Sequence, residues 1–253
     1  MKLHTNCEIG QDKLISDLEK DFDAIFLGIG ATASNSVKIA GEESSNVHFA
    51  IDFLTGIQKR NLGNKNVNYI DVKDKKVVVI GGGDTAMDCV RTSVREGAES
   101  VKCLYRRDEK NMPGSKKEVV NAKEEGVEFV FNVSPKSIKV EDDLALGVEL
   151  LETSLSEADS SGRQKVVINE GSEYLEDADI IILALGFSPE VPAFLKELNV
   201  ETNSWGAVVI DSKFKTSNKK VYAGGDCQRG AHLAVTAATD GREAARAITK
   251  ELL

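Results

Sequence analysis

The stretch KVVVIGGGDTA at residues 76–86 decides the fold. Its first five residues form an unbroken, mostly β-branched run, which is typical of a parallel strand covered on both faces. The run passes directly into Gly81, Gly82 and Gly83, and then into residues with helical periodicity up to about Gly97. A strand, a glycine turn and a helix in this order predict the first βα unit of a dinucleotide-binding domain.

The glycines have the spacing of the fingerprint G-x-G-x-x-G/A, written here as Gly81-x-Gly83-x-x-Ala86. We expect Gly81 to allow the tight turn, Gly83 to let the backbone approach a pyrophosphate, and Ala86 to permit close helix–strand packing. The helix start, with Asp84 and Thr85, offers unpaired N–H groups and a positive dipole to the anion. The alternative is a glycine-rich turn without a ligand, but a strand and a helix in register favour the site.

The next predicted strand, residues 100–105, ends at Arg106 and Arg107. This position, roughly 20 residues past the glycines, lies beside the adenosine ribose in such domains. Two guanidinium groups favour a 2′-phosphate, which planar forks bind in bidentate fashion, so the pair predicts NADPH rather than NADH. A solvated basic strand end is the alternative, and the following Asp108 and Glu109 weaken the positive field.

Outward from this unit, the sequence predicts an α/β architecture. A helix at 115–125 and a strand at 127–131 extend the unit to β-α-β-α-β, and alternating runs over 133–175 predict an antiparallel flap on the parallel sheet. The remaining predicted elements are helices at 10–21, at 48–60 and from 231 to the C-terminus, and strands at 24–30, 179–186, 207–210 and 221–223. Two of these strands, 24–30 and 179–186, end in glycine, which indicates two related dinucleotide domains.

The stretch VYAGGDCQRG at 221–230 leaves two interpretations open. Asp226, at a strand end, can accept hydrogen bonds from the hydroxyls of a sugar alcohol, while the following helix faces a phosphate or a flavin carbonyl. The other interpretation is an Asx-type turn that caps the helix.

The composition is that of a globular protein. The chain has 253 residues, 41% of them hydrophobic and 29% charged, and a formal net charge of −9 that would repel a phosphate backbone, so we expect no nucleic acid partner. No stretch approaches the roughly 18 apolar residues that cross a bilayer, and no apolar signal core follows Met1. We therefore expect no membrane association and a cytoplasmic location.

The four cysteines, Cys7, Cys89, Cys103 and Cys227, form no C-x-x-C. We interpret them as isolated buried thiols, and three scattered histidines add no metal-ligand set, so no metal site is predicted. A disulfide reductase of the thioredoxin-reductase type would need a C-x-x-C in the nucleotide domain, which this sequence lacks.

Three strings together resemble the small subunit of NADPH-dependent glutamate synthase and its relatives, within the pyridine nucleotide–disulfide oxidoreductase superfamily. They are VVVIGGGDTAMDCVRTSVREGAESVKCLYRRDEKNMPGSKKEV at 77–119, ALGFSP at 184–189 and VYAGGDCQRGAHLAVTAATDGREAARAI at 221–248. The resemblance implies two Rossmann-like, three-layer domains: an NADPH-binding domain at 72–185, inserted into a truncated FAD-binding domain split between 1–71 and 186–253.

The resemblance also implies hydride transfer from NADPH to FAD and electron flow through iron–sulfur clusters to a large subunit. The residues that it assigns to NADPH are Gly81, Gly83, Asp84, Thr85 and Ala86, with Arg106 and Arg107 at the 2′-phosphate. Gly82 and Gly186 are also predicted to bind a cofactor. Those that it assigns to FAD are Gly28, Gly30, Gly225, Asp226, Thr236 and Ala237. Hydride transfer depends on placing two cofactors against each other, so no catalytic side chain is predicted.

The sequence departs from the family at its front. Family members begin with a cysteine-rich cluster-binding region and an FAD fingerprint, and residues 1–23 contain neither. We expect that the sequence is a fragment or that another polypeptide supplies the missing half of the FAD domain, which leaves FAD binding by this chain alone open.

The leading hypothesis is a cytoplasmic NADPH-dependent flavoprotein oxidoreductase, the electron-input subunit of glutamate synthase. Its partner would be the large subunit or another iron–sulfur acceptor. The alternatives are an NADPH-binding module without turnover and the input subunit of a related NADPH:acceptor oxidoreductase.

Overall fold

The computed structural model describes residues 2–158 and 164–253, which divide into two compact units. The central unit spans residues 34–186, and the terminal unit combines residues 1–33 with 187–253. The two connections between the units carry the short strands β2 (Ala33–Ser34) and β12 (Phe187–Ser188).

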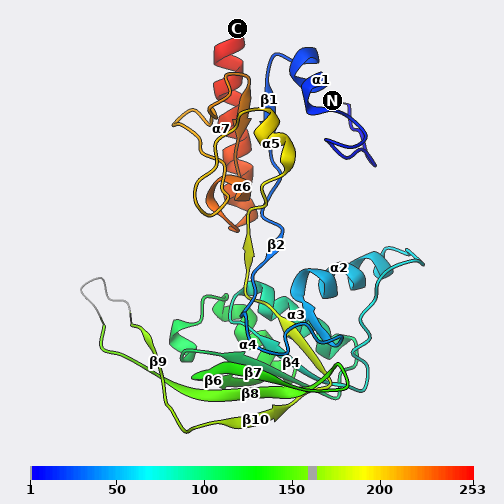
Figure 1. Cartoon of the computed structure of the whole chain (residues 1–253), viewed down its shortest axis with the longest axis vertical. Helices are drawn as coiled ribbons and strands as arrows, with labels where there is room; N and C mark the ends of the chain where they lie inside the picture. Colours follow the sequence, from blue (N-terminus) through cyan, green and yellow to red (C-terminus); the bar gives the residue numbers. More distant parts are fainter. Residues whose placement is uncertain (1, 159–163) are drawn as a thin grey trace. The chain divides into compact units, whose positions relative to one another are not determined.

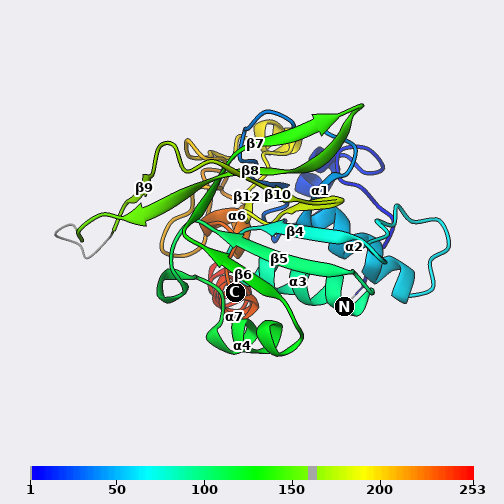
Figure 2. The same cartoon turned by 90° about the horizontal axis from the view of Figure 1, so that it is seen from below.

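A five-stranded parallel sheet forms the middle of the central unit, in the order β3-β11-β4-β5-β6. Figure 2 shows β4, β5 and β6 of this sheet side by side. Its strands are β3 (Val47–Phe49), β4 (Lys76–Ile80), β5 (Ser100–Tyr105), β6 (Glu128–Phe131) and β11 (Ile180–Leu183). Every residue of β4 except Lys76 is buried, as is all of β11, because layers cover both faces of these strands. The predicted strand at 76–80 and the β-α-β-α-β order are confirmed.

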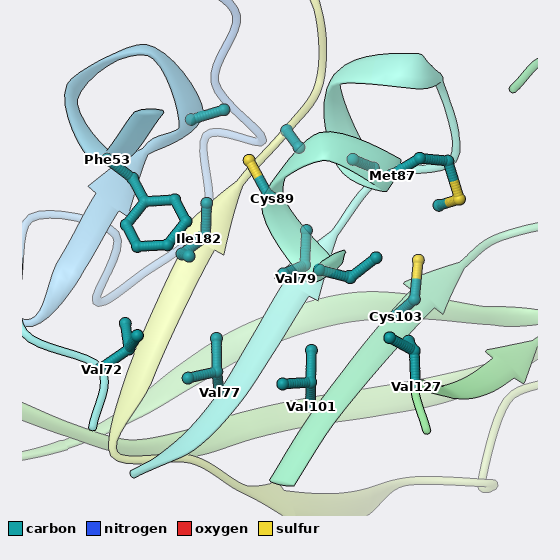
Figure 3. Close-up of a cluster of buried hydrophobic side chains, with 14 of the residues drawn as sticks. Phe53, Val72, Val77, Val79, Met87, Cys89, Val101, Cys103, Val127 and Ile182 are labelled. Atoms are coloured by element: carbon teal, nitrogen blue, oxygen red, sulfur yellow. The ribbon is translucent and has the colours of Figure 1, made fainter. Parts of the chain in front are cut away.

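Helices cover one face of this sheet. They are α2 (Ala50–Asn61), α3 (Asp84–Arg95) and α4 (Lys116–Glu124), with a short 3₁₀ turn, η1 (Glu109–Asn111), before α4. Figure 3 shows Phe53 of α2 beside Ile182 of β11, and Met87 of α3 on the side of Val79 and Cys103, all within one buried cluster. This core fixes the start of α3 above the end of β4, where the candidate site lies.

An antiparallel sheet covers the other face. It has the order β10-β8-β7, with β9 pairing β8. Its strands are β7 (Val133–Glu141), β8 (Leu144–Leu155), β9 (Val166–Ile168) and β10 (Tyr174–Asp177). Its inner side chains, including Ile138, Val148 and Leu150, pack against Ile80 and Leu104 of the parallel sheet. The predicted antiparallel flap is therefore confirmed as a third layer; part of the acidic, Ser/Gly-rich stretch within it, 159–162, lies outside the described residues.

The terminal unit has a two-stranded parallel sheet and its own core. Its elements are α1 (Ile15–Asp21), β1 (Ile25–Leu27), α5 (Ala193–Glu197), β13 (Val221–Ala223), α6 (Asp226–Arg229) and α7 (Ala234–Leu252). Figure 1 labels its helices α1, α5, α6 and α7. Leu27, Val221 and Cys227 are buried in this core together with Leu195 of α5. The last helix packs only in part, since Ala244 is buried but Leu233, the N-cap of α7, is 58% exposed.

Several predicted elements differ from the structure. The strand predicted at 207–210 is wrong: Val208 N–H donates to the Cys227 carbonyl and Val209 N–H to the Glu201 carbonyl, so the two residues serve different partners rather than one ladder. The helix predicted from residue 10 begins at Ile15, and the one predicted from residue 48 begins at Ala50 because the preceding residues form β3 beside β11.

The compact units also have other boundaries than the predicted domains. Phe53 and Ile57 of α2 belong to the same buried cluster as Val77 and Val79, so residues 34–71 pack with the central unit. Residues 62–66, between α2 and β4, form a loop within this unit. Which segments serve FAD and which serve NADPH stays a prediction.

Candidate nucleotide-binding site

A cavity of about 800 Å³ lies at the carboxyl edge of the parallel sheet, wholly within the central unit. Ligands of open α/β sheets bind at this edge, because the loops and helix starts that can hold them gather there. Of the residues predicted to bind a cofactor, those that line the cavity are Gly81, Gly82, Gly83, Thr85, Arg106, Arg107 and Gly186. The structure therefore brings most of the predicted set together around one space.

The three glycines of the turn have different surroundings. Gly81 has φ of +153°, and a Cβ there would lie 2.2 Å from the Ala184 carbonyl oxygen. A Cβ on Gly82 would lie 2.4 Å from the ring of Tyr105. Nothing lies within 4 Å of a Cβ on Gly83, so that position faces open space at the start of α3. The first two glycines thus serve the fold, and only Gly83 leaves room for a ligand against its backbone.

Two predicted residues do not line the cavity. Ala86 is fully buried in the core under α3, as close helix–strand packing requires. The Asp84 carboxylate accepts a hydrogen bond of 2.7 Å from the backbone N–H of Ser115. This hydrogen bond joins the loop after β5 to the start of α3. A second one joins the same loop to the glycine turn, since the Gly114 N–H donates to the Gly82 carbonyl over 3.0 Å.

The arginine pair lies at the end of β5, and both residues line the cavity. Neither guanidinium forms an ion pair with a described residue, and the Arg107 Nε is buried without a hydrogen-bond partner. A buried donor without a partner is costly, and a phosphate oxygen would satisfy it. The residues present therefore fit a phosphate-bearing nucleotide.

The acidic neighbours of the pair have other partners. The Asp108 carboxylate accepts from both the backbone N–H of Asn111, at 3.0 Å, and the side-chain amide of Asn111, at 2.8 Å. Glu109 forms an ion pair of 2.7 Å with Lys123. Both carboxylates thus have local roles, one capping η1 and one joining the loop to α4, so neither pairs with Arg106 or Arg107.

Sequence reasoning missed one wall of the cavity. It is formed by residues before the predicted domain boundary, by the loop after β5 and by the start of β7: Asn35, Ser36, Val37, Ile39, Tyr105, Asn111, Pro113, Val133, Ser134, Pro135 and Leu185 among them. Asn35 is fixed there because its backbone N–H donates to the Gly186 carbonyl and its side chain to the Leu185 carbonyl. No motif marks this segment, since its place follows from tertiary contacts alone.

The residues predicted for FAD lie in the terminal unit. Parallel pairing of β1 with β13 sets Gly28 beside Gly224, whose N–H donates to the Leu27 carbonyl over 3.2 Å. Gly225 follows with φ of +77°, and a Cβ there would lie 3.3 Å from that of Ala237. The structure thus gathers the predicted Gly28, Gly225 and Ala237.

The other residues predicted for FAD, Asp226, Thr236 and Gly30, each have a different local environment. Asp226 has a buried Oδ1 without a partner, which suits the acceptor role for a sugar-alcohol hydroxyl. The cap of α6 is Gly225, so Asp226 is not the capping residue of an Asx turn. Thr236 lies with its hydroxyl 3.0 Å from His232 Nδ1, and Gly30 has φ of +75° with open space around it.

The cysteines are only partly as predicted. Cys89, Cys103 and Cys227 are buried, and burial raises the pKa of the Cys103 thiol to about 12, which makes it unreactive. Cys7 is exposed, so the prediction of a buried thiol was wrong there. In the part of the chain that the structure describes, no cluster of three or more His, Cys, Asp or Glu side chains could hold a metal ion. No helix among the described residues is long and apolar enough to cross a membrane.

Comparison with known proteins gives the family. The family description "Pyridine nucleotide-disulphide oxidoreductase" matches residues 5–241. The glutamate synthase [NADPH] small chain of Escherichia coli is 45% identical over 251 residues, covering 96% of this chain and 53% of that protein. The NADPH-Fe(3+) oxidoreductase subunit beta of Geobacter sulfurreducens is 35% identical over 269 residues, covering 96% of this chain and 39% of that protein.

Solved structures agree on the fold. Mycobacterium tuberculosis FprA in complex with NADPH has a TM-score of 0.80 at 17% identity, covering 98% of this chain and 67% of that chain. The chain spans about half the length of the curated glutamate synthase small chains that it matches. The resemblance stated from the three strings is confirmed, as is the Rossmann-type α/β fold. On its fold, its glycine turn and the match over residues 5–241, the chain belongs to the pyridine nucleotide-disulphide oxidoreductase family.

Proposed function

We propose that this chain is the NADPH-binding part of a flavoprotein oxidoreductase, the electron-input subunit of glutamate synthase. In the whole protein, a hydride passes from NADPH to FAD and electrons move on to a large subunit. The observation that carries the proposal is the cavity at the sheet edge, where the glycine turn lies around one space with two arginines that form no ion pair with a described residue. The likeness to glutamate synthase [NADPH] small chains supports the choice of acceptor.

The chain's own residues supply binding and orientation. Gly83 and the start of α3 would hold the pyrophosphate, since the backbone is open there and the helix dipole favours an anion. Arg106 and Arg107 would hold the 2′-phosphate. NADPH, when bound, supplies the hydride, and the transfer needs no proton from the protein. We therefore assign no acid or base to this chain.

Calorimetry with NADPH and NADH tests the cofactor site. We expect wild-type chain to prefer NADPH, and Arg106→Ala and Arg107→Ala each to weaken NADPH binding by about 10- to 100-fold, the size of one charged hydrogen bond. NADH binding should change by less than about threefold, because NADH lacks the phosphate that these residues meet.

Arg95→Ala is the matched control. Arg95 lies at the other end of α3, is exposed, and pairs with Glu125 at 2.8 Å, so its loss should leave both affinities unchanged. A cofactor preference that survived both Arg106→Ala and Arg107→Ala would contradict the proposed site.

FAD binding by this chain alone is a separate matter. In the described parts of the terminal unit, the glycines after β1 lead into β2, and those after β13 lead into the four-residue helix α6, so neither glycine turn starts a long helix that could hold the FAD pyrophosphate. This favours the second candidate, an NADPH-binding module that needs another polypeptide segment for turnover. We accordingly propose FAD as the cofactor of the whole protein, and the large subunit or another iron–sulfur protein as its partner; the cytoplasmic location stays a prediction.

The visible spectrum of the purified chain separates these candidates. Flavin bands at about one FAD per chain would contradict the module. A colourless chain that still binds NADPH would contradict turnover by this chain alone. The similarity to an NADPH-Fe(3+) oxidoreductase subunit keeps a related NADPH:acceptor oxidoreductase as the alternative for the whole protein.

A further inference from the structure

The backbone that carries the arginine pair is held from outside the βαβ unit. The Thr153 hydroxyl, on β8, donates to the Arg106 carbonyl over 3.0 Å. The backbone N–H of Asn132 donates to the Arg107 carbonyl over 3.1 Å. The carbonyls of Arg106 and Arg107 are therefore held by a strand of the antiparallel layer and by the residue that leads into that layer.

Thr153 and Asn132 are themselves joined. The backbone N–H of Thr153 donates to the Asn132 carbonyl over 2.7 Å. Asn132 has φ of +56°, a left-handed conformation that asparagine tolerates better than most residues, and it stands where the chain turns from β6 into β7. At this turn the N–H of Asn132 donates to Arg107 and the carbonyl of Asn132 accepts from Thr153. Hydrogen bonds therefore link the arginine pair, Asn132 and Thr153.

Thr153 is unusual in being buried and polar. Its exposed fraction is 5%, and it is one of few buried polar side chains among the described residues. A buried hydroxyl must find a partner, and here the partner is the carbonyl of Arg106. The Thr153 hydroxyl thus forms its hydrogen bond with the segment that carries the arginine pair.

We infer that Thr153 is a positioning residue for cofactor choice: it holds the Arg106 backbone so that the arginine pair meets the 2′-phosphate of NADPH. The inference rests on the proposed function and adds a residue from the antiparallel layer to the site. Arg106 is exposed and has no ion partner among the described residues, so its backbone anchor restrains where its guanidinium can reach. Without the anchor, the loop must be ordered when the phosphate binds, which costs affinity.

The effect should be selective for the phosphate. Thr153 contacts the strand end and does not line the cavity, whereas the pyrophosphate would lie at Gly83 and the start of α3. Loss of the hydroxyl therefore leaves the part of the site that NADH and NADPH share.

Calorimetry on three variants of the full chain tests this. Thr153→Val removes the hydroxyl at constant shape, Thr153→Ser keeps it, and Ser154→Ala removes the neighbouring hydroxyl, which faces Asn169 instead. We expect Thr153→Val to weaken NADPH binding by about 3- to 10-fold, the range of one neutral hydrogen bond, and NADH binding by less than twofold. Thr153→Ser and Ser154→Ala should keep the wild-type ratio of the two affinities. Thermal melting confirms that each variant is folded at the temperature of the titration.

The titrations distinguish failure of the proposed cofactor site from failure of the role inferred for Thr153. A wild-type chain without any preference for NADPH would overturn the proposed cofactor site and this inference together. A wild-type preference that falls in Arg106→Ala but is unchanged in Thr153→Val would overturn this inference alone. Equal loss of NADH and NADPH affinity in Thr153→Val would also overturn it, because that pattern reports general damage to the site.

Discussion

At the scale of single residues, the glycine turn separates structural from ligand-binding requirements. A fingerprint gives Gly81 and Gly83 equal weight, but their surroundings differ. Gly81 faces the Ala184 carbonyl and has a positive φ, while Gly83 faces open space. The difference leads to opposite expectations for two chemically identical substitutions.

Gly81→Ala should destabilise the fold, and Gly83→Ala should spare it. At Gly81 the added Cβ meets backbone at 2.2 Å in a conformation that L residues avoid, so we expect a loss of about 2–4 kcal/mol in the free energy of unfolding. At Gly83 we expect a loss of at most about 1 kcal/mol together with a tenfold or greater loss of NADPH affinity. Urea denaturation and calorimetry measure the two effects. Equal stability of both variants would show that the turn tolerates a side chain at either glycine.

At the scale of elements, charged side chains join α3 to α4. Arg91 of α3 bonds Glu118 of α4 and, at 2.7 Å, Glu125 at the end of α4, while Arg95 bonds Glu125 at 2.8 Å. Hydrogen bonds from Arg91, and then from Arg95, lower the pKa of the Glu125 carboxyl to about 2. The ion cluster therefore ties together the helix that begins the nucleotide site and its neighbour.

The cluster should give the stability a pH dependence. Because the Glu125 pKa is lowered on folding, its contribution is full above the unfolded value near 4.5 and is lost as pH falls toward 2. We expect Glu125→Gln to be less stable at neutral pH and to lose less additional stability between pH 4.5 and 2. Urea denaturation across that range measures this, with the exposed neighbour Glu124→Gln as the control. Parallel curves for wild type and Glu125→Gln would show that the cluster does not couple to folding.

One buried carboxylate of helix α7 holds the glycine pair between β13 and α6. Asp240 is 4% exposed, accepts from the Gly225 N–H over 2.8 Å and pairs with Arg229. We expect Asp240→Ala to lose about 1–3 kcal/mol of stability, because a buried amide and a guanidinium are left without their acceptor. Glu243→Ala, which breaks an exposed pair with Arg246 on the same helix, should give no resolvable change. If the two variants melted alike, Asp240 would not anchor the turn.

At the scale of the whole molecule, cofactor binding and stability should be linked. NADPH at 100 times its dissociation constant should raise the free energy of unfolding by about 2.7 kcal/mol if it binds only the folded chain. Hydrogen exchange should slow most at the glycine turn and at the end of β5, and least at α1 and α5 of the terminal unit. Slowing confined to the terminal unit would contradict a site in the central unit.

The sequence was sufficient where a local pattern has one physical meaning. The β-branched run before the glycines is a strand in almost any fold that buries it, and the spacing of Gly81, Gly83 and Ala86 leads to a helix start. The parallel unit, the arginine pair and the antiparallel layer were all predicted in this way. The strand predicted at 207–210 failed because its backbone bonds reach separate distant partners.

The sequence by itself determined the βα unit, its glycine turn and the basic end of β5, since each depends on residues near one another in the chain. Only the tertiary structure decided the rest of the site: Asn35 in the cavity wall, Asp84 turned to Ser115, and Thr153 holding the carbonyl of Arg106. These contacts join residues 31 to 150 positions apart. No local periodicity encodes such pairs, because they form only when separate layers pack and each buried polar group must find a partner.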